Sequence, residues 1–166
     1  MAERKLVVPK RTITFEGIFN MKELYNFIDS WFAQHGFDKG EDKNVMQVTE
    51  QGKYVYLNLL PTKTISDYAK VTLRIEVLSE GYKDVTIKKD GVNVDMHQGR
   101  VNVSVYGFLV TDYEGRWTGK PFVFMMRMIF EKFVYTTFNS KMNGIVSSFY
   151  SEFVSDVKNF FNMYKL

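Results

Sequence analysis

The sequence contains no cysteine, which excludes disulfide bonds, thiolate nucleophiles and cysteine-based metal sites. Its two histidines, His35 and His97, lie far apart and match neither the HxH nor the HExxH spacing of metal ligands. The chain also lacks a Gly-x-Ser-x-Gly elbow, a P-loop and a dinucleotide-binding fingerprint. We therefore expect no catalytic residue, no metal and no cofactor, and the sequence leans against an enzyme.

Long apolar runs and a dominant charge are missing as well. The longest apolar run, residues 121–129, contains Arg127 and is too short to cross a membrane. The run 6–8 ends at Pro9 and is too short for a signal-peptide core. The 22 basic residues are interspersed with 19 acidic ones, so we do not expect a nucleic-acid partner. These features predict a soluble, cytoplasmic protein.

The chain length and its local patterns predict one domain with a short N-terminal arm. A chain of 166 residues is long enough to bury the core of one ordinary domain. Residues 1–10 are expected to form a loosely ordered arm, and residues 11–166 a single α+β domain. Residues 11–16 alternate polar and apolar side chains, which predicts a strand.

A helix is predicted over residues 21–35. Asn20 is a suitable N-cap, and Gly36 stands where a helix commonly ends. We expect His35 to contact the terminal carbonyl groups of this helix and His97 to be exposed beside a turn. The apolar residues recur at spacings of three and four, as in a one-sided helix: Leu24, Phe27, Ile28, Trp31 and Phe32.

The middle of the chain predicts an antiparallel meander. Pairs such as Glu80-Gly81, Asp90-Gly91 and Gln98-Gly99 are turn signals, and Asp-Gly is among the strongest hairpin signals. The strands expected between these turns are 45–50, 54–60, 69–78, 84–88, 92–97 and 100–112. With the first strand this makes about seven, with one face of the sheet on a core and the other in water.

A long helix is predicted for residues 120–164. Unbroken, it would be about 65 Å long at ~1.5 Å per residue, whereas a domain of this size has a radius of gyration of about 15 Å. We expect a break within residues 139–144, which are poor in helix-forming side chains. The second half has one apolar stripe: Met142, Ile145, Val146, Phe149, Phe153, Val157, Phe160 and Tyr164.

The first half of this helix is apolar on two sides, and such a helix is usually covered on both. We expect one set of side chains, together with the loop residue Trp117, to line a ligand cavity: Phe122, Met126, Phe130 and Phe133. The other set is expected to meet the first helix, a partner chain or a lipid-like ligand: Phe124, Met128 and Tyr135. Packing of both sets in an ordinary core is an equally good interpretation.

The order strand, helix, six-stranded meander and long C-terminal helix resembles the helix-grip fold of the START-like superfamily. The resemblance runs from residue 11 to residue 166 and concerns architecture, because no motif matches residue by residue. It implies an α+β fold in which a curved antiparallel sheet surrounds the long helix. It also implies an apolar cavity between the sheet and that helix, which in the family binds lipids, sterols or other hydrophobic molecules.

Two functions follow from these patterns. In the first, the protein holds a small hydrophobic or lipid-like molecule between the sheet and the C-terminal helix. In the second, it is a protein-protein interaction module or a homodimer that uses the apolar surface of that helix.

Overall fold

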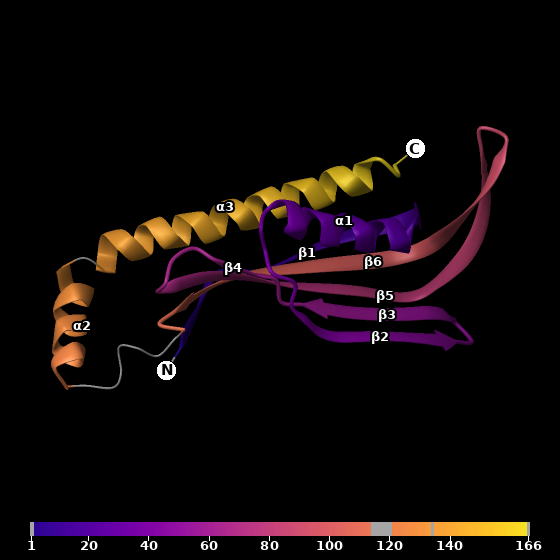
Figure 1. The fold of residues 1–166 in the computed structure, drawn as a ribbon. Helices are drawn as coiled ribbons and strands as arrows, with labels where there is room; N and C mark the ends of the chain where they lie inside the picture. The colour runs from indigo at the N-terminus through magenta and orange to yellow at the C-terminus, as the bar shows by residue number, and fades with distance from the viewer. Residues whose placement is uncertain (1, 114–120, 134, 166) are drawn as a thin grey trace.

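The structure is a computed structural model that describes residues 2–113, 121–133 and 135–165. It is an α+β fold in which an antiparallel sheet carries α1 and α3 on one face (Figure 1). Within the described residues the sheet has six strands in the order β1-β6-β5-β3-β2, and β4 pairs with β5. The elements are β1 (Glu3–Phe19), α1 (Met21–Gln34), β2 (Glu41–Thr49), β3 (Gly52–Leu59), β4 (Thr62–Thr64), β5 (Ala69–Lys89), β6 (Val92–Thr111), α2 (Pro121–Phe133) and α3 (Tyr135–Asn162).

Alternating side chains give the sheet one buried face and one face that is partly exposed to solvent. On β5, Val71, Leu73 and Ile75 are fully buried under the helices, whereas Arg74 and Glu76 lie on the other face and are partly exposed. The period of two along a strand places these two sets on opposite sides. The predicted α+β class, with one face of the sheet on a core, is confirmed.

Two of the predicted turns are not turns, which reduces the seven predicted strands to five, and the short strand β4, which was not predicted, brings the described strands to six. The pairing of β5 with β6 shifts register between Glu80 and Lys83 and then continues, so each predicted pair of strands is one long strand. The glycines there mark a bulge and a close approach of backbones, since a Cβ on Gly99 would lie 2.8 Å from the Cβ of Tyr82. The hairpin predicted at Asp90-Gly91 is confirmed, with positive φ at both residues.

The N-terminal arm was wrongly predicted to be loose. Strand β1 begins at Glu3 and pairs with the end of β6, with Leu6 opposite Phe108 and Val8 opposite Gly107. Pro9 falls where the register shifts between Val8 and Arg11. An edge strand tolerates proline at such an irregularity because no neighbour needs its missing N–H, so the proline does not end the strand.

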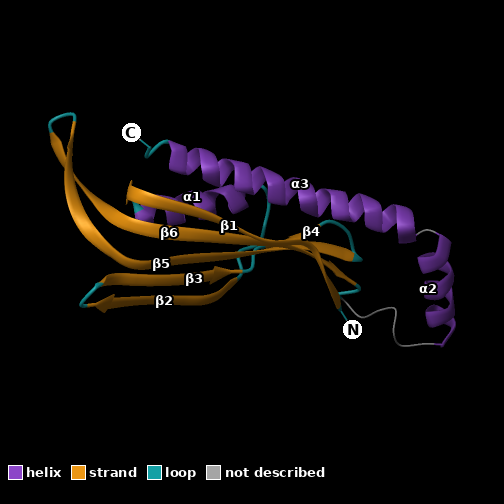
Figure 2. Cartoon of the chain, turned by 180° about the vertical axis from the view of Figure 1, so that it is seen from behind, coloured by secondary structure: helices purple, strands orange, loops and turns teal. Residues whose placement is uncertain are grey.

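The C-terminal helix is divided, but five to ten residues earlier than predicted. Helix α2 ends at Phe133 and α3 begins at Tyr135, so residues 139–144 lie inside α3. Met142 and Val146 are buried against the sheet, and this packing outweighs the weak propensity of Gly144 between them. Helix α3 runs lengthwise over the sheet, whereas α2 stands at an angle beyond the end of the sheet (Figure 2).

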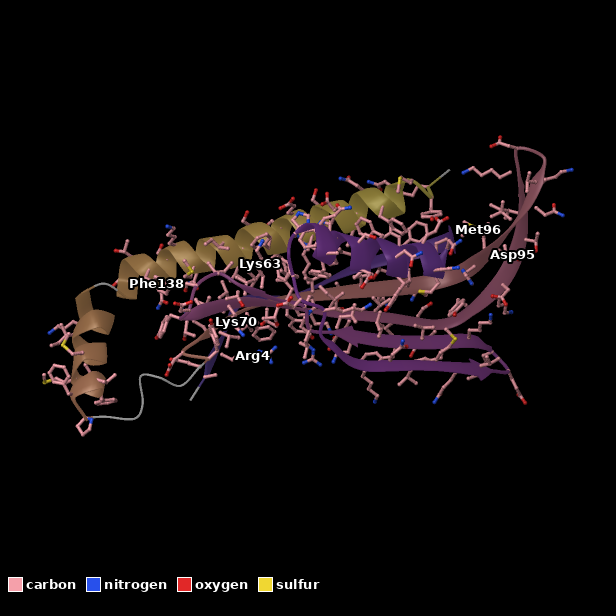
Figure 3. All side chains as sticks on the ribbon, viewed as in Figure 1. Arg4, Lys63, Lys70, Asp95, Met96 and Phe138 are labelled. Atoms are coloured by element: carbon pink, nitrogen blue, oxygen red, sulfur yellow. The ribbon has the colours of Figure 1, made fainter. Side chains whose placement is uncertain are left out.

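Aromatic side chains join α1 and α3 to the sheet. Phe153 of α3 packs against Trp31 and Phe32 of α1, with ring centroids 5.0 and 5.1 Å apart. Phe161 of α3 stacks on Phe15 of β1 at 4.9 Å. The predicted apolar stripes of α1 and of the second half of the long helix therefore form the core, and their side chains lie between the helices and the sheet (Figure 3).

Candidate functional site

A pocket of about 300 Å³ lies between α1 and the sheet. Helix α1 forms one wall, and strands β2, β3, β5 and β6 form the other. Its lining residues are Met21, Lys22, Leu24, Tyr25, Ile28, Asn44, Met46, Lys53, Val55, Leu57, Val77, Tyr82 and His97.

The periodicities of helix and strand bring these apolar residues to one place. On α1, Met21, Tyr25 and Ile28 are spaced by four and three residues and so share a face. On β3, Val55 and Leu57 are two residues apart and face the helix. Val55 lies opposite Met46 of β2 in the antiparallel register. The pocket is thus walled by an apolar helix face on one side and an apolar sheet face on the other.

Three polar side chains, those of His97, Asp84 and Lys53, meet at one end of this pocket. His97 accepts a hydrogen bond at Nδ1 from the backbone N–H of Met21, 3.1 Å away. Its Nε2 lies 3.6 Å from Oδ1 of Asp84. Lys53 donates to both carboxylate oxygens of Asp84 at 2.8 and 2.6 Å. Because Nδ1 is an acceptor, the neutral imidazole carries its proton on Nε2 and is a donor on that side.

Hydrogen bonding and burial determine the protonation states of the side chains at the polar end of the pocket. The hydrogen bond from Lys53 lowers the pKa of the Asp84 carboxyl, and the same bond raises the pKa of the lysine. Burial raises the pKa of the Tyr82 phenol. At neutral pH the end therefore presents a carboxylate, an ammonium group and an un-ionised phenol.

The bulge in β5 is what places Tyr82 inside. Only 2% of its surface is exposed, and its ring lies 5.3 Å from that of His97 and 6.5 Å from that of Phe19. Gly52, at the turn into β3, approaches the backbone of Gly81 so closely that a Cβ would lie 2.7 Å from its carbonyl carbon. Glycine on both strands lets β3 meet the bulge and close this end of the pocket.

Two other hollows are less suited to a ligand. One of about 170 Å³, between α1 and β3, is lined by Asp29 and Lys39, whose side chains form an ion pair at 2.8 Å. The other, of about 490 Å³, is lined by polar side chains of α3 alone and is an open surface: Thr136, Thr137, Ser140 and Lys141.

Of the predicted ligand-binding residues, the two whose side chains the structure describes do not line the pocket. Phe122 and Met126 are 68% and 46% exposed on α2, beyond the end of the sheet. Trp117 lies outside the described residues, and the side chains of Phe130 and Phe133 are likewise not described. The space between α3 and the sheet is occupied by the buried core, so the pocket lies under α1.

The predicted interface residues lie on or beside the same helix. Phe124 and Met128 are 55% and 57% exposed, and they share α2 with the ligand-binding candidates. Tyr135 begins α3, and its side chain is not described.

His97 was wrongly predicted to be exposed beside a turn. It lies within β6, and its side chain is 22% exposed at the pocket. The error arose because Gln98-Gly99 was interpreted as a turn. A prediction of one continuous strand over residues 92–111 would have placed His97 inside the sheet. The prediction for His35 is confirmed, since its Nδ1 lies 2.7 Å from the carbonyl oxygen of Trp31 and its Nε2 3.0 Å from Glu152.

The described residues form neither a metal site nor a membrane-spanning helix. No group of three or more histidine, aspartate or glutamate side chains in that part of the chain is arranged to hold a metal ion. None of its helices combines the length and apolar character that a membrane span requires.

Comparison with known proteins assigns no family. Neither the family models, nor the curated proteins, nor the solved structures include a match to this chain.

Proposed function

We propose that this protein binds a small, mainly apolar molecule that carries an oxygen-bearing polar end, in the pocket between α1 and the sheet. The observation that carries the proposal is the combination of an apolar pocket with a few polar side chains gathered at one end. Ligand sites in proteins commonly have this composition and volumes of about 300–1,000 Å³.

The apolar walls supply the affinity for such a molecule. Ile28, Val55, Leu57 and Val77 are almost fully buried, so the pocket floor is apolar and well packed. Burial of apolar ligand surface there is favourable by roughly 25 cal/mol per Å². Tyr25 and Met46 at the edge are less buried and can adjust to the ligand outline.

The polar end orients the molecule. The Nε2–H of His97 and the un-ionised phenol of Tyr82 are donors for an oxygen atom, and Lys53 adds a positive charge. A carbonyl, hydroxyl or carboxylate oxygen fits these groups, whereas a cationic end would compete with Lys53 for Asp84.

Membership of the START-like superfamily is part of this proposal. The antiparallel sheet with a long C-terminal helix supports it, and the family's hydrophobic ligands are of the same chemical class. The pocket lies beneath α1 here, in place of the expected position beneath the long helix. The cytoplasmic location also stays a prediction.

Binding of 1-anilinonaphthalene-8-sulfonate, displaced by decanoic acid, tests the proposal. Met46→Trp would obstruct the pocket edge at a position that is 66% exposed, so its folding should be unaffected. Val48→Trp is the matched control, since Val48 is exposed on the same strand and does not line the pocket. We expect Met46→Trp to weaken binding at least tenfold and Val48→Trp to leave it unchanged.

The exposed apolar helix α2 could also attract this dye, so each titration is repeated in a Met128→Asp background. Dye binding that decanoic acid fails to displace, or that Met46→Trp leaves intact, would contradict the proposal.

A further inference from the structure

Helix α2 carries a dense set of exposed apolar side chains. Within thirteen residues, six large apolar side chains are between 46% and 68% exposed: Phe122, Phe124, Met125, Met126, Met128 and Ile129. They occupy consecutive turns and point in several directions around the helix axis. In Figure 3 the described side chains of α2 lie clear of the sheet.

This exposure reaches the upper limit of what a single, self-contained molecule shows. With roughly 200 Å² for each large side chain, the six leave about 600 Å² of apolar surface in water. The largest apolar patch on a typical monomer is about 300–600 Å², and larger patches mark interaction sites. The core beneath α1 and α3 is complete without α2, so folding of the sheet and its two helices does not explain this helix.

We propose that α2 is a self-association surface that a second copy of this chain covers. Two copies that contribute about 600 Å² each would bury about 1,200 Å², which reaches the range of stable, specific interfaces. Because the same surface serves both copies, the arrangement closes as a two-fold dimer and leaves no patch exposed.

The position of α2 suits this partner. It projects beyond the end of the sheet (Figure 1), so the α2 helices of two copies can lie side by side without a clash between the sheets. A helix that is apolar all round can pack against the partner's α2 on one side and the start of the partner's α3 on another. Methionine and phenylalanine fill such irregular contacts well.

A membrane surface fits α2 less well. Interfacial helices carry a strongly charged face rich in Lys and Arg opposite the apolar one. The sequence of α2 contains Arg127 and Lys132 against Glu131, a net charge of only +1 from two positive groups and one negative group. The inference is independent of the proposed ligand, because the pocket is lined by α1 and the sheet.

Sedimentation equilibrium of the full chain over a concentration series tests the inference. We expect a monomer–dimer equilibrium whose dissociation constant rises about 100-fold in Met128→Asp, because the substitution occurs twice in a two-fold interface. Met163→Asp is the matched control, since Met163 is 73% exposed at the opposite end of the chain's helical layer and should leave the equilibrium unchanged. Circular dichroism and the thermal midpoint verify that both variants are folded.

A monomer at all concentrations, or a dimer that Met128→Asp does not weaken, would overturn the inference. Binding of a monomer to vesicles of phosphatidylcholine and phosphatidylglycerol, abolished by Met128→Asp, would overturn it in favour of a membrane. Because the chain has no cysteine, a bismaleimide should link Met125→Cys copies into dimers and leave Met163→Cys copies as monomers. Equal cross-linking of both, or of neither, would also overturn it.

Discussion

The backbone N–H of Met21 donates a hydrogen bond to Nδ1 of His97, 3.1 Å away. Met21 is the first residue of α1, and its N–H is one of the donors that no carbonyl of the helix can satisfy. Asn20 accepts from the next two N–H groups. The bond thus fastens the start of α1 to β6 and fixes the polar end of the pocket.

His97→Ala should lower the free energy of unfolding by about 1–3 kcal/mol, because it leaves the Met21 N–H without its acceptor and removes ring contacts with Phe19 and Tyr82. Urea unfolding measures the change. Gln98→Ala, at the exposed neighbouring position, should cost less than about 0.5 kcal/mol. Equal losses in the two variants would show that His97 does not hold the helix.

Lys53→Met should raise the pKa of Asp84 back toward its ordinary value of 3.8, because the lysine's hydrogen bond is the main cause of the lowered pKa. The folded-state pKa lies below the unfolded one, so the pair stabilises the fold above pH 3.8, and this contribution is lost as the pH falls through the folded-state pKa. NMR titration of the carboxyl carbon measures the shift. An unchanged Asp84 titration in Lys53→Met would contradict the assignment.

Trp31→Phe should lower the free energy of unfolding by about 1–3 kcal/mol. The substitution removes the donor at Nε1, which lies 2.8 Å from Oδ2 of Asp156 and joins α1 to α3. A double-mutant cycle with Asp156→Ala isolates the hydrogen bond from the loss of ring packing against Phe153. Coupling below about 0.5 kcal/mol in thermal or urea unfolding would mean that the bond contributes little.

Gly99→Ala should destabilise the fold by about 1–3 kcal/mol, because its Cβ would lie 2.8 Å from the Cβ and 2.9 Å from the Cα of Tyr82. Gly144→Ala is the opposite case. Nothing lies within 4 Å of its added Cβ, and it is in the interior of α3. We expect it to stabilise the fold by about 0.5–1 kcal/mol. A gain for Gly99→Ala would show that the bulge tolerates a side chain.

Periodicity in the sequence predicted the architecture well and the connections less well. One-sided burial produces a regular pattern of apolar residues. The strand at residues 69–78 was predicted from alternation, and the helix from Leu24 to Phe32 was predicted from spacings of three and four. Glu80-Gly81 and Gln98-Gly99 were misinterpreted because a glycine at a bulge and a glycine at a turn look alike in one sequence. The distinction depends on the partner strand, 2.8 Å from the missing Cβ of Gly99.

The residues of the candidate site were harder to predict from the sequence than the fold. The polar residues of the site come from β3, β5 and β6, and only the register of those strands brings Lys53, Asp84 and His97 together. The unusual load of Phe and Met in α2 was recognised, but sequence alone did not reveal that α2 turns away from the sheet. The different direction of α2 relative to α3 leaves these side chains exposed.

The most direct test of the proposed pocket is a titration of the isotope-labelled protein with decanoic acid, followed by methyl NMR spectra. The account predicts saturable shifts for methyl groups of Ile28, Val55, Leu57 and Val77, and none for Met128 on α2. The same titration of Met46→Trp should need at least tenfold more ligand. Shifts confined to α2, or shifts that rise without saturation, would contradict a binding site between α1 and the sheet.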